Sequence, residues 1–284
     1  MEKIAVVTYT GSNLSFAQAK ELGIYLLPLQ ITIDETTYQD TLEISTQDIY
    51  NELAKGKMPK TSMAAYQKIY DLFEELKKEY DTVFAIPLTN GLSTNASTMQ
   101  SIARELEMNV HVIDMYATCS LEKHVAIWIK KLVDENKSSE EILKIIQPAI
   151  DESNSLILVK NLQHLKRGGR LTPMAATLAG LLKIYPILHI NKSTEGRIDV
   201  LNKVRTEKRA DAYAIDKVID DIDIEHTVIY IIHSNFLEGA NHFKKCFIEK
   251  GVPEQNIHID YISSVIAVHT GLGCIAIQYI REEN

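Results

Sequence analysis

Cysteine is scarce in this sequence of 284 residues, where Cys119, Cys246 and Cys274 are the only three. Their number is odd, they lie far apart, and none belongs to a Cys-x-x-Cys pair. This usage excludes a disulfide framework and a cysteine zinc site, and it is typical of a reducing compartment. The chain also opens directly on a strand-like apolar run, with no signal-peptide pattern. We therefore predict a cytoplasmic protein.

Long apolar runs and an excess of positive charge are also missing. No uninterrupted apolar stretch reaches the roughly 18 residues of a membrane-spanning helix, so we expect no stable membrane insertion. The formal net charge is -8, which disfavours a nucleic-acid-binding protein because phosphate neutralisation needs a basic face. Basic residues do cluster locally, at residues 160–170 and 203–209. A local anion site is therefore compatible with the sequence.

The common catalytic motifs are absent as well. The chain has no phosphate-binding loop, no Gly-x-Gly-x-x-Gly after a strand, no His-Glu-x-x-His and no Gly-x-Ser-x-Gly. Its nine histidines are scattered without ligand spacing, so we expect no metal and no cofactor. Carboxylates at strand ends are few, Asp114 being the clearest, whereas magnesium-assisted phosphoryl transfer needs several. The sequence therefore favours a binding protein over an enzyme.

The pattern of apolar residues predicts an α/β fold with two domains. In the first half, strand-like runs alternate with amphipathic helices, which predicts a mostly parallel sheet with helices on both faces. In the second half, some successive strand candidates are separated only by turns, at residues 191–196 and 271–273, which predicts hairpins in an α+β domain. Residues 264–269 are predicted as one of these strands. We place the domains at residues 1–154 and 155–284.

Residues 161–188 combine a basic turn with an apolar stretch. A short polar helix leads into Lys166-Arg167-Gly168-Gly169-Arg170, after which the chain becomes small and apolar. Adjacent glycines allow a positive φ and a close approach of the backbone, and a guanidinium suits a carboxylate or phosphate. An anionic head with an apolar tail would fit both parts. A helix C-cap followed by an ordinary core helix also fits this stretch.

Three hydroxyl-rich segments come after predicted strands or before helices, at residues 8–12, 61–62 and 89–93. In an open α/β sheet the ligand crevice lies beyond the carboxyl ends of the strands. Hydroxyls and free helix N-terminal amides there stabilise an anion, although each segment is also explained as a simple cap. His269 is expected in a turn after a strand, where it could donate to a carboxylate or be satisfied by the backbone.

Read in order, these segments resemble the DegV family of bacterial fatty-acid-binding proteins. The resemblance spans essentially the whole chain, and it is carried by the order and spacing of the motifs. The motifs are Val6-Val7-Thr8, Leu27 to Thr32, Pro59-Lys60-Thr61-Ser62, Gly91-Leu92-Ser93, Val112-Ile113-Asp114, Leu165 to Leu171, Pro186-Ile187-Leu188, Val204-Arg205-Thr206 and Val265 to Gly271. The chain departs from the family pattern at Tyr9-Thr10, Met63, Thr94-Asn95-Ala96 and Leu272.

The resemblance implies a two-domain protein that holds one long-chain fatty acid, as ligand rather than cofactor, in an interdomain tunnel. It also implies delivery of the carboxylate to a separate fatty-acid kinase, which forms an acyl phosphate for phospholipid synthesis. The positions implied to contact the carboxylate are Thr61, Ser62, Ser93, Arg170, His269 and Thr270. Arg205 matches a basic position implicated in handling the partner or phosphate. Leu178, Leu181, Leu182 and Ile184 are candidates either to line the tail or to form plain core.

Two other hypotheses remain open. One is an acyl hydrolase or acyltransferase with Ser93 as nucleophile and His269 as base, which needs those side chains within hydrogen-bond reach and an oxyanion hole. The other is a lipid sensor that binds the same ligand but has no kinase partner.

Overall fold

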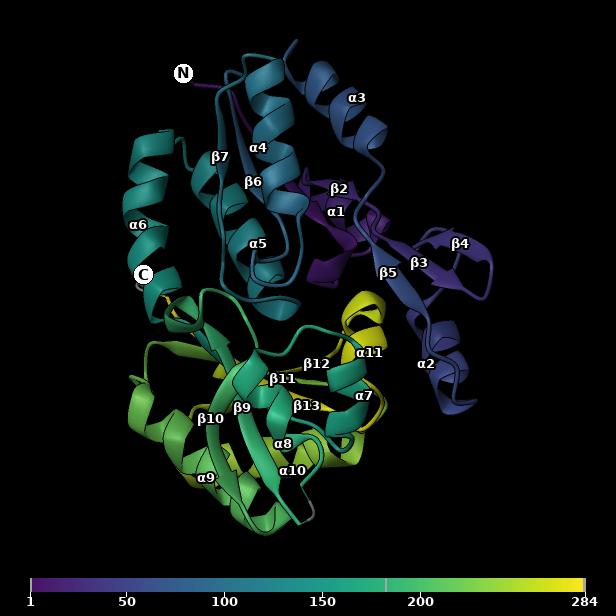
Figure 1. The fold of residues 1–284 in the computed structure, drawn as a ribbon. Helices are drawn as coiled ribbons and strands as arrows, with labels where there is room; N and C mark the ends of the chain where they lie inside the picture. The colour runs from purple at the N-terminus through teal and green to yellow at the C-terminus, as the bar shows by residue number, and fades with distance from the viewer. Residues whose placement is uncertain (1, 182, 283–284) are drawn as a thin grey trace.

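The computed structural model describes residues 2–181 and 183–282. Figure 1 shows an upper lobe built on a parallel sheet and a lower lobe built on a six-stranded sheet. The strands of the parallel sheet, in spatial order, are β2 (Tyr25–Leu27), β1 (Ile4–Tyr9), β6 (Thr82–Ile86) and β7 (Val110–Val112). Its helices are α1 (Phe16–Leu22), α3 (Tyr66–Leu76), α4 (Asn95–Glu105), α5 (Ser120–Asp134) and α6 (Ser139–Glu152).

Strand β1 is buried on both of its sides. Ala5 and Val7 belong to a core cluster with the buried faces of α3 and α4, whereas Ile4 and Val6 belong to a second cluster with α5 and α6. Successive side chains of a strand point to opposite faces, so helices on both faces require the continuous apolar run that the sequence has. The predicted parallel sheet with helices on both faces is confirmed.

The six-stranded sheet is mostly antiparallel. Its strands, in spatial order, are β10 (Asp199–Val204), β9 (Tyr185–Asn191), β8 (Asn154–Leu158), β13 (Ile275–Arg281), β11 (Thr227–His233) and β12 (Ile257–Tyr261), and β11–β12 is the parallel pair. Helices α9 (Glu207–Asp221) and α10 (Leu237–Glu249) pack on one face. Helices α7 (Leu162–Arg167) and α8 (Pro173–Leu178) contribute to the core on the other. The predicted α+β architecture and the β9–β10 hairpin are confirmed.

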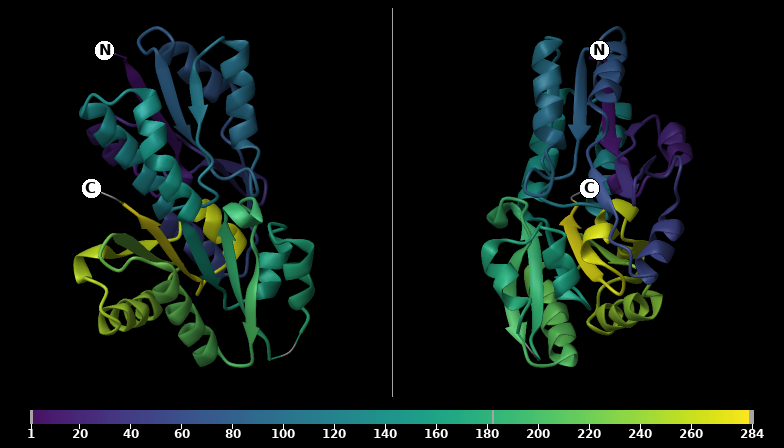
Figure 2. Two further views of the ribbon diagram at one scale, coloured as in Figure 1. Left: turned by 90° about the vertical axis from the view of Figure 1, so that its left-hand side faces the viewer. Right: turned by 45° about the vertical axis from the view of Figure 1, so that its right-hand side comes forward.

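A third, antiparallel sheet has the order β4 (Thr36–Gln39), β3 (Gln30–Ile33) and β5 (Lys60–Ser62). Together with α2 (Thr46–Ala54) it forms an arm that reaches along the lower lobe (Figures 1 and 2). The Tyr50 hydroxyl of α2 donates to the Ile262 carbonyl at 2.6 Å. Residues 61–62 were expected ahead of a helix, and α3 does follow at Tyr66. Residues 60–62 also form a strand that was not predicted, in which Thr61 pairs with Ile31 of β3.

Residues 264–270 form helix α11 (Ser264–Thr270) rather than the predicted strand. Its β-branched composition favours a strand, but Val265, Ala267 and Val268 are all buried and the helix packs against α2 and α7. Tertiary packing of this kind overrides local propensity. The predicted hairpin at residues 271–273 is therefore wrong, and these residues lead from α11 into β13. None of the helices in residues 2–181 and 183–282 is long and apolar enough to cross a membrane.

Candidate functional site

A cavity of about 530 Å³ lies between the two lobes, and we call it the interface cavity. Segments from both halves of the chain line it, and they include all six residues predicted for the anion site: Thr61, Ser62, Ser93, Arg170, His269 and Thr270. Its apolar surface comes from Leu29, Met63, Leu88, Leu92, Ile198, Val265 and Ile266. No carboxylate side chain occurs among the described residues that line it. The cavity therefore combines an apolar wall with cationic and hydroxyl groups.

His269 lies in the last turn of α11 and faces β5 across the cavity. Its Nε2 is 2.7 Å from the Thr61 Oγ1. On its other side the chain of Gly168 approaches so closely that a Cβ added there would lie 3.0 Å from Nδ1. The close approach expected at the paired glycines is therefore present, and the group approached is His269. Helix α7, strand β5 and helix α11 meet at this histidine.

Burial lowers the pKa of His269 to about 4, and the neighbouring Arg170 guanidinium contributes in the same direction. A contact with the Gly168 backbone acts in the opposite direction. The imidazole is therefore uncharged near neutral pH. A neutral imidazole beside a guanidinium has a low affinity for a proton, and an anion bound nearby would raise that affinity.

The loop that carries Ser93 is fixed by a contact between two glycines. A Cβ added at Gly91 would lie 2.2 Å from the Gly196 backbone, and one added at Gly196 would lie 1.8 Å from the Thr89 Oγ1. Gly196 also has a φ of +70°, which favours glycine. The loop after β6 therefore rests directly on the turn of the β9–β10 hairpin. This contact places a hydroxyl from the upper lobe beside residues of the lower lobe.

The remaining predicted side chains make bonds of different kinds. Arg170 is partly buried, and its Nη1 donates to the Gly168 carbonyl at 2.8 Å. In the described chain it forms no ion pair with a carboxylate. The Thr270 hydroxyl donates to the Ile266 carbonyl at 3.3 Å, and the exposed Ser62 hydroxyl donates to the Gln30 Oε1 at 3.0 Å. Arg170 is therefore the one formally charged side chain among the described residues that line the interface cavity, whereas the Ser62 and Thr270 hydroxyls already have acceptors.

The nucleophile–base contact that the hydrolase hypothesis requires is not formed between the described residues. The His269 ring bonds Thr61, whereas the Ser93 Oγ accepts a bond from Asn95 Nδ2 at 2.8 Å. A serine nucleophile is activated by a base within hydrogen-bond reach. In this geometry Ser93 lacks the base contact that a serine nucleophile needs.

Two further sequence predictions fall outside the interface cavity. Arg205 is exposed in the turn between β10 and α9 and does not line it. Three of the four candidates to line the tail do not line the cavity, namely Leu178, Leu181 and Ile184. Leu178 is buried elsewhere and Leu181 is exposed. The fourth candidate, Leu182, lies outside the described residues. The apolar wall comes instead from Ile198, which directly precedes β10, from α11 and from the first half of the chain.

Sequence reasoning also missed lining residues of the interface cavity. Asn90 and Asn95 line it but were not predicted as site residues. A signal existed for Asn95, because it is one of the departures from the family pattern directly after Gly-Leu-Ser.

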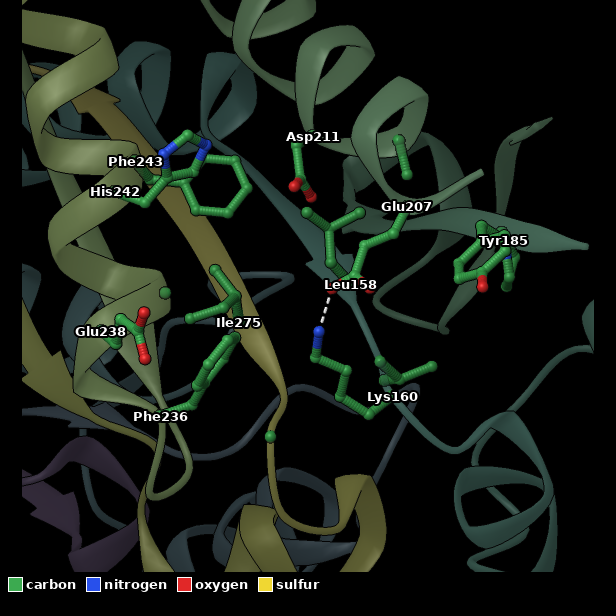
Figure 3. A pocket seen from close by; sticks show the side chains of 15 residues that line it. Leu158, Lys160, Tyr185, Glu207, Asp211, Phe236, Glu238, His242, Phe243 and Ile275 are labelled. Carbon is green, nitrogen blue, oxygen red and sulfur yellow. Dashed lines mark hydrogen bonds and ion pairs between the residues drawn. The ribbon is translucent and has the colours of Figure 1, made fainter. Parts of the chain in front are cut away.

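A second cavity of about 360 Å³ lies between α9 and α10, on the opposite face of the six-stranded sheet (Figure 3). We call it the helix cavity. Apolar side chains of Leu158, Phe236, Phe243 and Ile275 form part of its wall. The acidic and basic side chains that line it are Lys160, Glu207, Asp211, Glu238 and His242.

The single lysine of the helix cavity is already neutralised. The Lys160 ammonium forms an ion pair with Glu207 and lies 4.8 Å from the centre of the Phe236 ring. Burial raises the pKa of Asp211, since a desolvated carboxylate disfavours its charge. The excess of carboxylates makes this cavity unsuitable for an anion.

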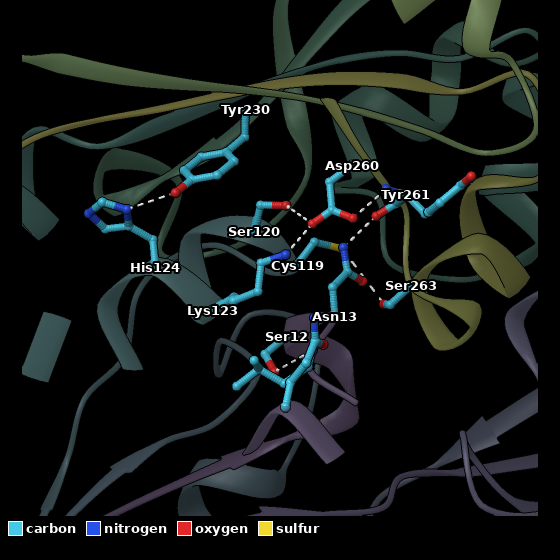
Figure 4. Close-up of polar contacts among 12 residues, drawn as sticks. Ser12, Asn13, Cys119, Ser120, Lys123, His124, Tyr230, Asp260, Tyr261 and Ser263 are labelled. Carbon is cyan, nitrogen blue, oxygen red and sulfur yellow. Dashed lines mark hydrogen bonds and ion pairs between the residues drawn. The ribbon is translucent and has the colours of Figure 1, made fainter. Parts of the chain in front are cut away.

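Polar contacts between α5 and the lower lobe hold the two lobes together (Figure 4). The Ser120 hydroxyl, at 3.2 Å, and the Lys123 ammonium both donate to the Asp260 carboxylate. The His124 Nδ1 lies 2.9 Å from the Tyr230 hydroxyl. These contacts fix the relation between the lobes that the interface cavity requires. Within the described residues, no group of three or more His, Cys, Asp or Glu side chains could hold a metal ion.

Comparisons with known proteins agree with this architecture. Residues 3–282 match the family model described as "Uncharacterised protein, DegV family". A DegV domain-containing protein of Halalkalibacterium halodurans is 32% identical, with the alignment covering 100% of both chains. The fatty acid binding DegV family protein of Streptococcus agalactiae has a TM-score of 0.91 at 29% identity and full coverage of both chains. DegV of Bacillus subtilis, described as a fatty acid binding protein, has a TM-score of 0.87 at 28% identity, covering 99% of this chain and 100% of its own. The chain belongs to the DegV family.

Proposed function

We propose that the protein is a non-enzymatic carrier that binds a long-chain fatty acid with its carboxylate in the interface cavity. The observation that carries this proposal is the convergence of Thr61, Ser93, Arg170 and His269, from four separate segments, on one cavity without a described carboxylate in its lining. The fatty-acid binding of the similar S. agalactiae and B. subtilis proteins supports the same ligand class.

The two parts of the cavity match the two parts of such a ligand. Each buried methylene contributes about 0.8 kcal/mol, so a long alkyl chain supplies on the order of 10 kcal/mol before ordering costs. A buried carboxylate costs several kcal/mol unless it is paired or hydrogen-bonded. Charge-assisted hydrogen bonds return roughly 1.5–3 kcal/mol each. Arg170 and the cavity hydroxyls would therefore orient the acid, while the apolar wall would supply affinity.

The proposal extends to a partner. The carrier would present the carboxylate to a fatty-acid kinase, which forms an acyl phosphate for phospholipid synthesis in the bacterial cytoplasm. Arg205 would contact that kinase or its phosphate, and its exposed position away from the interface cavity supports a role outside ligand binding. We further propose that residues 1–154 and 155–284 are the two domains, because the boundary falls at the start of β8, the first strand of the six-stranded sheet along the chain, which begins at Asn154.

Native mass spectrometry of the purified protein tests the binding step. We expect a mass increase equal to one long-chain fatty acid, lost on delipidation and regained by titration with palmitate. A strictly ligand-free mass with no saturable palmitate uptake would refute the carrier function. An acyl phosphate assay with the kinase encoded in the same genome separates a carrier from a lipid sensor. In that assay Arg205→Ala should reduce product formation and leave palmitate binding unchanged.

A further inference from the structure

The hydroxyl of Ser93 accepts two hydrogen bonds from one neighbour. The Asn95 Nδ2 donates to the Ser93 Oγ at 2.8 Å, and the Asn95 backbone N–H donates to the same atom at 3.3 Å. A serine hydroxyl has two lone pairs and one proton. With both lone pairs occupied, the proton must be donated elsewhere. Because Ser93 lines the interface cavity and donates to no described residue, the proton is available to a group inside that cavity.

Asn95 is an unexpected residue for its position. It is the first residue of α4, its side chain is fully buried, and its Oδ1 has no hydrogen-bond partner among the described residues. A buried acceptor without a partner costs about 1–3 kcal/mol, which an apolar residue such as leucine would avoid. The stability of the fold therefore does not explain why an amide side chain occurs here, whereas its hydrogen bond to Ser93 gives it a role.

We propose that Asn95 is a positioning residue that fixes the Ser93 hydroxyl as a donor toward an anionic head group. The site would thereby prefer a carboxylate over an uncharged head on the same alkyl chain. This inference rests on the proposed fatty-acid binding and adds to it a determinant of head-group specificity. Asn95 acts through Ser93 and need not contact the ligand itself.

Calorimetric titrations with dodecanoate and with 1-dodecanol test the inference, because the two ligands share a tail and differ in the head group. Asn95→Leu removes the side-chain donor and keeps the branching of the side chain, so dodecanoate should bind about 3- to 10-fold more weakly while dodecanol changes less than about twofold. The carboxylate introduced by Asn95→Asp can only accept hydrogen bonds, so the Ser93 hydroxyl would donate to it instead of to the ligand. This substitution should weaken dodecanoate binding by more than about tenfold. Asn95→Thr keeps a donor and should restore much of the preference.

A double-mutant cycle shows whether the effect passes through Ser93. In a Ser93→Ala background, Asn95→Leu should cause no further loss of dodecanoate affinity. Equal losses for the acid and the alcohol, or an undiminished loss in that background, would overturn the inference. So would unchanged dodecanoate affinity in Asn95 variants whose melting temperatures match the unaltered protein. If the unaltered protein binds neither ligand, the proposed function itself fails, and this outcome is distinct from the others.

Discussion

The interface cavity and the helix cavity differ in charge more than in the presence of apolar surface. The first measures about 530 Å³ and the second about 360 Å³, and both are partly walled by aliphatic or aromatic side chains. Arg170 lacks a carboxylate partner among the described residues, whereas Lys160 is paired with Glu207 and has further acidic neighbours. The presence of a cavity alone would therefore not identify the binding site of an anionic lipid. The charges of the side chains that line each cavity distinguish the two.

The strongest test of this contrast removes the cation from each cavity. Arg170→Met should weaken palmitate binding about 10- to 100-fold, since a charge-assisted bond of roughly 1.5–3 kcal/mol is lost. Lys160→Met is the matched control, with the same side chain introduced into the helix cavity, and should leave the affinity within about twofold. Fluorescence displacement with a bound fatty-acid probe measures both. If Lys160→Met has the larger effect, the assignment of the two cavities is reversed.

A second test uses pH. The pKa of His269 is lowered to about 4 without ligand, and a carboxylate bound nearby would raise it. Between pH 4 and the raised pKa of the complex, palmitate binding would then be accompanied by uptake of a proton by His269. Palmitate affinity should therefore increase as pH falls through that range, by up to about tenfold per pH unit. His269→Gln introduces a side chain that does not titrate, so this variant should lose the increase in affinity. It should keep only the pH dependence that comes from ionisation of palmitate itself. Titration in buffers of different ionisation enthalpy measures the proton uptake directly.

His124 provides a comparison outside both cavities. Burial lowers its pKa to about 4 as well, so folding keeps it neutral while the unfolded chain binds a proton below its usual pKa near 6.5. Its contribution to the free energy of unfolding is therefore present above pH 6.5 and is lost as pH falls toward 4. His124→Gln should reduce the acid sensitivity of the melting temperature and leave the pH dependence of palmitate affinity unchanged.

The smallest expected effect separates two neighbouring hydroxyls on β5. Thr61→Val removes the group that bonds His269 and should weaken palmitate binding about 3- to 10-fold, as expected for loss of one uncharged hydrogen bond. Ser62→Ala removes an exposed hydroxyl that already donates to Gln30 and should change affinity by less than about twofold. Equal effects of the two changes in a displacement assay would mean that contact with His269 is unimportant.

Local sequence information was sufficient where a segment's environment follows from its own pattern. The Ser45 hydroxyl caps α2 by accepting a hydrogen bond from the Asp48 backbone N–H, a contact between residues three apart that the local sequence alone indicates. The apolar run of β1 correctly indicated a strand covered on both faces. The six residues implied by the family resemblance all line one cavity, although their contacts with a ligand remain a prediction.

Where the prediction was wrong, the deciding contacts came from distant parts of the chain. Val265 to Val268 lie in a helix rather than in the predicted strand because α2 and α7 cover them. Residues 60–62, for which no strand was predicted, form one because β3 offers a pairing edge. Neither partner can be identified from the local pattern. The bond between Asn95 and Ser93 is local, but its importance depends on the burial of Asn95, which the sequence does not show.

The backbone contact between Gly91 and Gly196 has a consequence for how the protein tolerates mutation. A methyl group added at position 196 collides with Thr89 and pushes away the loop that supplies Ser93. Positions far apart in the chain are therefore constrained as a pair, and a change in the hairpin of one lobe alters recognition by the other. Variants that lose ligand affinity while keeping every ligand-facing side chain should be sought first at these two glycines.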